Sequence, residues 1–201
     1  FVRTSAVPPP ISTIILPFAS ATGTPAPIAA AIGSLKGPKH GGANIAAINM
    51  MDHIKEQVPN FNNRGKLDDY LIKILKKEAY DKTGLVYGMG HAIYTLSDPR
   101  AKVLKSMAKK LAESKYMEDD FLLCDYIEKR VPVLKAELTG VDKPMPANVD
   151  LYSGLVYRTL GIPEDLFTPL FAVARVAGWC AHRLEEVATC SRIMRPAYKS
   201  I

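Results

Sequence analysis

Apolar residues recur every three or four positions along several stretches of this chain. One such stripe consists of Leu67, Tyr70, Leu71, Ile74 and Leu75, and another of Ile45, Ile48, Met50, Met51 and Ile54. This spacing is typical of amphipathic helices, so it predicts helices over 67–80 and 41–57. Because no stretch of any length alternates apolar and polar residues, we expect an all-α fold.

Capping residues, prolines and glycines predict further helix boundaries. Asp98 followed by Pro99 is typical of an N-cap and a first helical position, which predicts a helix over 100–114. Other helices are expected over 27–35, 118–138 with an interruption at Pro132, 148–160 closed by Gly161, and 166–189. The remaining stretches predict an irregular segment over 1–26, a loop or short hairpin over 84–94, and a linker over 140–146.

The composition is that of a globular protein with a sizeable core. The chain has 201 residues, 48% of them hydrophobic and 23% charged, which suits one large domain. The net charge of +6 comes from lysines interspersed with acids, and the sequence has no arginine-rich arm with aromatics, so we expect no nucleic-acid partner. No apolar run reaches the about 18 residues that cross a membrane, so no membrane partner is expected either.

The chain contains three cysteines, Cys124, Cys180 and Cys190, and none of them forms a CxxC pair. An odd number without such pairs is typical of a reducing compartment and argues against a disulfide framework or a zinc site. The chain begins at Phe1, which predicts a processed product or a fragment.

His40 lies between the helix breaker Gly37-Pro38 and the predicted start of a helix at Gly41. The partial positive charge of a helix N-terminus disfavours a second charge on imidazole, so we expect a neutral His40 near pH 7. A neutral imidazole N–H can stabilise the oxygen of a forming enol. A histidine that only caps the helix is the alternative. His53 and His182, on predicted helices, are expected to be surface or packed imidazoles.

His91 follows Gly88-Met89-Gly90, where glycines allow the backbone to approach a ligand closely. A histidine at this position can donate a hydrogen bond to a carbonyl, and a loop histidine that faces water is the alternative. Met89 and the glycine backbone could line an adenine-sized slot. The segment is not a dinucleotide-binding fingerprint, because no strand precedes it and the third glycine is missing.

Asp150 lies between Val149 and Leu151, just before a predicted helix. Aspartate before a helix is usually a cap, which is the simpler interpretation. In an apolar pocket, desolvation raises the pKa of a carboxyl group and makes it a usable base, which is the functional alternative.

Three arginines are candidate ligands for carboxylates: Arg100, Arg175 and Arg195. Arg175 stands in the otherwise apolar stretch 171–179 and has no carboxylate three or four residues away. We therefore expect a buried guanidinium whose partner is either elsewhere in the fold or a dicarboxylate ligand bound by bidentate hydrogen bonds.

In this order, the motifs resemble those of the C-terminal half of citrate synthase. Residues 37–44 resemble the family's GPxHGxAN, 88–100 its GxGHxxY…DPR, 148–154 its NVDxYSG, and 167–179 its FTPLFAxARxxGW, and Arg195-Pro196 resembles a terminal arginine-proline. The resemblance runs from about Ala29 to Tyr198. It implies a helical small domain, 44–157, inserted in a helical large domain that is incomplete here and is represented by 27–43 and 158–201.

The resemblance also implies a role for each candidate residue. Asp150 would take a methyl proton from acetyl-CoA, His40 would hold the enol oxygen, and His91 would bind and polarise the oxaloacetate carbonyl. Arg100 and Arg175 would grip the oxaloacetate carboxylates, and Arg195 would reach into the other subunit of a homodimer. The residues expected to lie along CoA are Val86, Tyr87, Gly88, Met89 and Gly90.

The expected function is thus the condensation of acetyl-CoA with oxaloacetate to citrate and CoA, in the cytoplasm in preference to a mitochondrial matrix, with no metal and no tightly bound cofactor. Two alternatives remain at this point. One is a 2-methylcitrate synthase that uses propionyl-CoA, because one methylene group provides only about 1–3 kcal/mol of discrimination. The other is a non-catalytic truncated remnant that acts as a dimerisation or interaction module.

Overall fold

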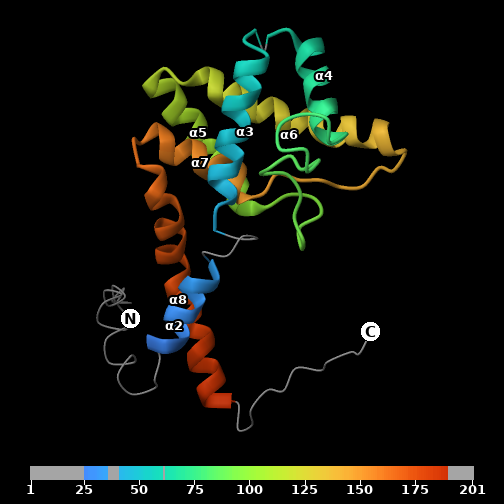
Figure 1. The fold of residues 1–201 in the computed structure, drawn as a ribbon. Coiled ribbons are helices and arrows are strands. Elements are labelled where there is room, and N and C mark those ends of the chain that lie inside the picture. The colour runs from blue at the N-terminus through green and yellow to red at the C-terminus, as the bar shows by residue number, and fades with distance from the viewer. Residues whose placement is uncertain (1–24, 36–40, 61, 190–201) are drawn as a thin grey trace, which may run out of the picture. The chain divides into compact units, whose positions relative to one another are not determined.

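The computed structural model describes residues 25–35, 41–60 and 62–189. These residues form helices α2 (Pro25–Leu35), α3 (Ala43–Gln57), α4 (Arg64–Leu75), α5 (Pro99–Lys115), α6 (Glu118–Thr139), α7 (Val149–Thr159) and α8 (Phe167–Thr189), with the short 3₁₀ helix η1 (Glu164–Leu166) before α8 (Figure 1). No strand forms within the described ranges, where the β pairing is the isolated bridge between Met89 and Ala147. The predicted all-α class is confirmed.

The chain divides into two compact units. The larger unit, Gly41–Phe167, contains α3 to α7 and η1. The other unit combines Phe1–His40 with Thr168–Ile201, and its described elements are α2 and nearly all of α8.

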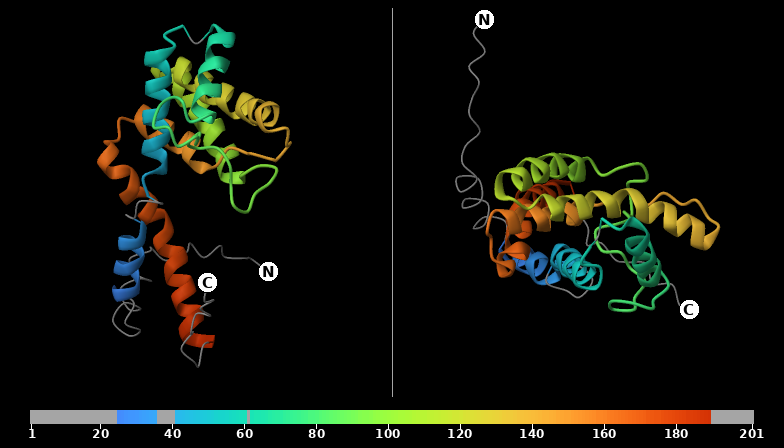
Figure 2. Two further views of the ribbon diagram at one scale, coloured as in Figure 1. Left: turned by 45° about the vertical axis from the view of Figure 1, so that its right-hand side comes forward. Right: turned by 90° about the horizontal axis from the view of Figure 1, so that it is seen from above.

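Helix α7 forms the centre of the larger unit. It packs against α3 and α5 (Figure 1), while α4 lies beside α6 (Figure 2). Seven of its eleven residues are buried, among them Leu151, Tyr152 and Leu155. A helix that is buried on most faces acts as the core around which amphipathic neighbours assemble. The catalytic candidate Asp150 therefore lies in the first turn of a well-packed helix.

Several helix boundaries differ from the prediction, and the largest shift is at the end of α4. Helix α4 ends at Leu75 and not at residue 80, because Lys77 and Tyr80 adopt left-handed backbone angles (φ 66° and 57°) that a helix cannot contain. Helix α2 begins at Pro25, two residues inside the segment predicted to be irregular. The loop predicted over 84–94 is confirmed as irregular, and Met89 pairs with Ala147 and not within a hairpin.

The predicted interruption of the helix at Pro132 is wrong. Helix α6 continues from Glu118 to Thr139 with Pro132 inside it. Proline removes one intrahelical hydrogen bond, but the buried stripe of α6 continues on both sides of it. This stripe consists of Leu123, Cys124, Ile127, Val131 and Leu134. Tertiary packing of that stripe outweighs the local cost.

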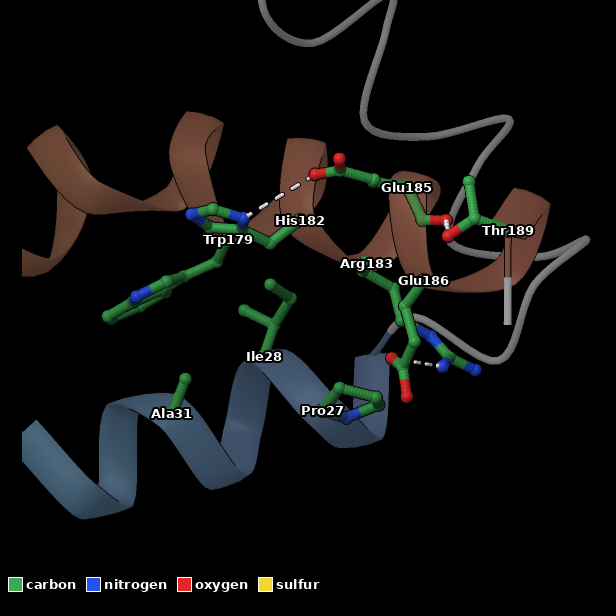
Figure 3. A pocket seen from close by; sticks show the side chains of 9 residues that line it. All are labelled: Pro27, Ile28, Ala31, Trp179, His182, Arg183, Glu185, Glu186 and Thr189. Atoms are coloured by element: carbon green, nitrogen blue, oxygen red, sulfur yellow. Dashed lines mark hydrogen bonds and ion pairs between the residues drawn. The ribbon is translucent and has the colours of Figure 1, made fainter. Parts of the chain in front are cut away.

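In the smaller unit, α2 and α8 line a groove of 510 Å³. Figure 3 shows Ile28 and Ala31 on α2 facing Trp179 on α8. His182 is 84% exposed at its side chain, as expected for a surface imidazole. Within the described part of the chain, no helix is both long and apolar enough to cross a bilayer.

Candidate active site

A short backbone pairing joins the segment before His91 to the start of α7. The Gly90 amide donates to the Pro146 carbonyl (2.7 Å), and the Asn148 amide donates to the Gly88 carbonyl (2.9 Å). These bonds flank the bridge between Met89 and Ala147. Two motifs that are 58 residues apart in sequence therefore lie side by side.

Gly88 allows this close approach. It has φ +85°, and a Cβ atom built on it would lie 2.7 Å from both Cα and Cβ of Leu151, in the first turn of α7. Any side chain at this position would thus collide with the helix backbone and also strain its own backbone. Gly88 thus allows the close approach of α7, and its expected contact with CoA stays a prediction.

The hydrogen bonds of His91 define the tautomer of its ring. Nδ1 lies 3.0 Å from the backbone N–H groups of both Ile93 and Tyr94, so it accepts from both of them. In the neutral imidazole the proton is therefore on Nε2. The Tyr94 ring packs against the imidazole, with a centroid distance of 4.7 Å. His91 is thus held as an Nε2–H donor.

Arg100 lies beside that donor and is held by Asp98. Asp98 is fully buried and accepts from Nε of Arg100 at 3.0 Å, from Nη2 at 2.8 Å and from the Arg100 backbone amide at 2.9 Å. Burial opposes ionisation of Asp98, but the hydrogen bonds and charge of Arg100 outweigh it, so the pKa of Asp98 is lowered. Asp98 takes two of the five guanidinium donors, which leaves the edge formed by Nη1 and Nη2 able to bind a carboxylate.

His91 and Arg100 lie side by side, and the charge of Asp150 acts on Arg100. Nη2 of Arg100 lies 3.4 Å from Nε2 of His91, and both atoms are donors in this tautomer, so one acceptor oxygen could bind both. The pKa of Arg100 is raised mainly by its hydrogen bond to Asp98, and the charge of Asp150 also contributes to this increase. The Asp150 carboxylate therefore lies within electrostatic reach of the guanidinium.

The interpretation of Asp150 as a helix cap is wrong. The N-cap of α7 is Asn148, whose side-chain oxygen accepts from the Asp150 backbone amide at 2.9 Å. Asp150 is the second residue of the helix and is half-buried. Because the cap is supplied by another residue, the carboxylate of Asp150 is not needed for that purpose.

The residues expected along CoA present mainly backbone. Val86 and Met89 are only 2% and 9% exposed and belong to the hydrophobic core. Tyr87 donates its hydroxyl to Asp81 at 2.6 Å. A contribution of Val86 or Met89 to CoA binding would therefore come from peptide groups and not from side chains, and it stays a prediction.

The expectation that Arg175 is buried is wrong. It is exposed on α8, with its guanidinium carbon 5.0 Å from the ring centroid of Phe171, and the neighbouring Val173 is 72% exposed. Apolar neighbours in sequence do not bury a residue when the helix face itself is uncovered. Its role toward a dicarboxylate stays a prediction. His40 and Arg195 lie outside the described residues.

Sequence reasoning missed the second role of Asp98, which it identified only as a helix cap, and both roles of Asn148. Each is an N-cap that also holds a second group: Asp98 binds the Arg100 side chain, and Asn148 donates from Nδ2 to the Gly90 carbonyl at 3.0 Å. The Asp-Pro-Arg order was a usable signal for Asp98, whereas nothing local pointed from Asn148 to Gly90. Over the described ranges, no cluster of His, Cys, Asp or Glu has the arrangement of a metal site.

Replacing Asp98 by asparagine tests the ion pair. We expect a loss of about 1–2 kcal/mol in the free energy of unfolding at pH 7, a modest value because Arg100 is 41% exposed. The lowered pKa of Asp98 in the folded state stabilises the protein above the unfolded value of about 3.9, and this stability is lost as the pH falls through the folded pKa. The difference between parent and variant in urea unfolding should therefore shrink from about pH 5 towards about pH 2.

Asn63→Ala is the control for this experiment, because it removes an uncharged N-cap from α4. Its cost should not depend on pH over this range. A constant difference for Asp98→Asn as well would contradict the assigned ion pair.

Comparisons with known proteins agree with the motifs. Residues 11–197 match a family model described as citrate synthase, C-terminal domain. The chain is 42% identical over 174 residues to citrate synthase 2 of Bacillus subtilis, covering 84% of this chain and 40% of that protein. It is 37% identical over 170 residues to 2-methylcitrate synthase of Shewanella oneidensis, covering 85% of this chain and 40% of that protein.

Among solved structures, the chain resembles the ternary complex of Thermoplasma acidophilum citrate synthase with carboxymethyl coenzyme A and oxaloacetate. The TM-score is 0.64 at 33% identity, over 87% of this chain and 42% of that one. Citrate synthase from Pyrobaculum aerophilum gives a TM-score of 0.65 at 31% identity, over 86% of this chain and 39% of that one. The chain thus spans about 40% of the length of its relatives. Since a family model matches nearly its whole length, the chain belongs to the citrate synthase family.

Proposed function

We propose that this chain carries the part of a citrate synthase that condenses acetyl-CoA with oxaloacetate. The observation that supports it most is the proximity of the His91 imidazole, an Nε2–H donor, to the guanidinium of Arg100 at 3.4 Å. The charge of Asp150 also acts on that guanidinium. A proton donor, an anion-binding group and a base are the groups that such a condensation requires.

The first step is enolisation of the thioester. The Asp150 carboxylate removes a proton from the methyl carbon of acetyl-CoA, and the electron pair of that C–H bond forms the enol double bond. His40 donates a hydrogen bond to the thioester oxygen as negative charge develops there. The role of His40 rests on the family resemblance alone.

The second step forms the carbon–carbon bond. The enolate carbon attacks the ketone carbon of oxaloacetate, and the enolate oxygen returns to a thioester carbonyl. The ketone oxygen takes a proton from Nε2 of His91, and the proton that Asp150 removed from the methyl group replaces the one that His91 gave up. The resulting citryl-CoA then reacts with water, which breaks the thioester bond and releases citrate and the CoA thiol. The Nε2–H tautomer of His91 supports this direction of proton transfer.

The proposal assigns oxaloacetate and CoA to separate parts of the chain. Arg100, Arg175 and Arg195 bind the oxaloacetate carboxylates, with Arg195 contributed to the neighbouring subunit of a homodimer. The peptide groups of 86–90 lie along CoA, which is a substrate and product and not a resident cofactor. Closure of the small domain, 44–157, over the substrate excludes water during condensation. The protein works in the cytoplasm.

A thiol assay tests the proposal. The chain is mixed with oxaloacetate and either acetyl-CoA or propionyl-CoA, and free thiol is followed over time. We expect oxaloacetate-dependent release that is faster with acetyl-CoA. Faster release with propionyl-CoA would favour a 2-methylcitrate synthase, the activity named for the Shewanella oneidensis relative. No release with either thioester, together with a dimer mass in light scattering, would favour the non-catalytic module.

A further inference from the structure

Asn148 makes three hydrogen bonds that meet at the junction of the two catalytic motifs. Its backbone amide donates to the Gly88 carbonyl (2.9 Å), its Nδ2 donates to the Gly90 carbonyl (3.0 Å), and its Oδ1 accepts from the Asp150 amide (2.9 Å). Gly90 directly precedes His91 in the chain. We propose that Asn148 is a positioning residue that holds the proton donor His91 and the base Asp150 in one fixed register. This inference rests on the proposed function.

Only a side-chain amide can make this connection. It carries a donor and an acceptor on the same short side chain, so one group can bind a carbonyl and an amide of two different segments. Serine at this position keeps the cap on α7 but has no second arm that reaches Gly90. Aspartate also keeps the cap, but it places a carboxylate oxygen against the Gly90 carbonyl, where a donor is needed.

The segment that carries His91 depends on this connection. Gly90 has φ +86° and no side chain, and the space where a Cβ atom would lie is open to within 3.9 Å of Met145. Gly90 itself contributes no side-chain packing, so its hydrogen bonds to Pro146 and Asn148 fix this peptide group. Catalytic groups require placement within about 0.5 Å, and a shift of about 1 Å lowers the rate by about 100-fold. Loss of the Nδ2 bond should therefore affect turnover more than stability.

The test compares Asn148→Ser and Asn148→Asp with Asn63→Ser. Asn63 is the N-cap of α4, where Oδ1 accepts from the Lys66 amide at 3.2 Å, so this control makes the same chemical change at a cap remote from His91. Three quantities are measured on the whole chain: hydrogen exchange of the Gly90 amide, NMR signals of the His91 ring, and kcat from thiol release.

In both Asn148 variants, we expect the Gly90 amide to exchange at least about tenfold faster, the His91 ring signals to move, and kcat to fall about 10- to 100-fold. All three should stay at the parent values in Asn63→Ser, and its thermal midpoint should change little because serine keeps the cap. Unchanged Gly90 exchange would overturn the inference, and so would faster exchange with unchanged kcat.

The outcome is separable from that of the proposed function. If the parent chain releases no thiol, the proposed enzyme activity fails, while Gly90 exchange and the His91 ring signals still report the connection. In that case, the positioning role is supported if the His91 ring signals move in the two Asn148 variants and not in Asn63→Ser. It is overturned if these signals do not move in the Asn148 variants.

Discussion

Replacing Asp150 by asparagine should lower thiol release from acetyl-CoA about 1,000-fold. Asparagine matches the shape of aspartate but cannot accept the methyl proton, and general-base catalysis typically contributes about 100- to 10,000-fold. The N-cap of α7 is Asn148 and not Asp150, so the variant keeps the cap and its hydrogen bond. Binding of CoA, measured by calorimetry, should change less than about threefold.

Asp119→Asn is the matched control for this variant. Asp119 is the second residue of α6, as Asp150 is the second residue of α7, and it is exposed. Both substitutions remove a negative charge from a helix N-terminus, which costs about 0.3–1 kcal/mol at the surface. Thiol release should fall in Asp150→Asn alone. An equal fall in both variants, or none in either, would show that Asp150 is not the base.

The largest loss of stability is expected for Gly154→Ala, at about 3 kcal/mol. A Cβ atom at this position would lie 2.7 Å from Cγ1 of Ile48 and 2.8 Å from the backbone oxygen of Asn44, both on α3. Ile48 is 1% exposed and has no room to turn away, and the Asn44 oxygen belongs to the helix backbone. The added methyl group would therefore overpack the contact between α3 and α7 and force the two helices apart. Urea unfolding followed by circular dichroism measures the loss.

Gly65→Ala is the control, because Gly65 also lies in a helix of the larger unit. Its added Cβ atom would lie 3.7 Å from Oδ1 of Asn63, an ordinary contact distance, and the site is exposed. Alanine is a better helix former than glycine by up to about 1 kcal/mol, so this variant should be neutral or more stable. Equal losses in Gly65→Ala and Gly154→Ala would contradict the close crossing of α3 and α7.

Local patterns predicted most of the helices because their causes lie within one or two turns. The Asp98-Pro99 start of α5 is confirmed, with the Asp98 side chain accepting from the Arg100 amide. The prediction failed where distant packing outweighs local preference. Pro132 remains inside α6 because the buried stripe of that helix spans it, and the left-handed residues after Leu75 end α4 despite an apolar pattern that continues.

The candidate site could be predicted in part. The sequence singled out His91, Arg100 and Asp150 from their motifs. The structure places His91 beside Arg100, whereas the catalytic role of Asp150 stays a prediction. The Asp-Pro-Arg order was the one signal in the sequence that Asp98 binds the guanidinium of Arg100. The inference for Arg175 failed because the polarity of sequence neighbours does not determine whether a helix face is covered.

By itself, the amino-acid sequence determined the all-α class, most helix starts and the identity of the chemically competent side chains, since these depend on residue type and on neighbours within a few positions. Only the tertiary structure decided which nitrogen of His91 carries the proton, which groups hold Arg100, and that Asn148 joins Gly90 to Asp150. These contacts depend on how α7 packs against the loop before His91, and no pattern within either segment encodes a distance to the other.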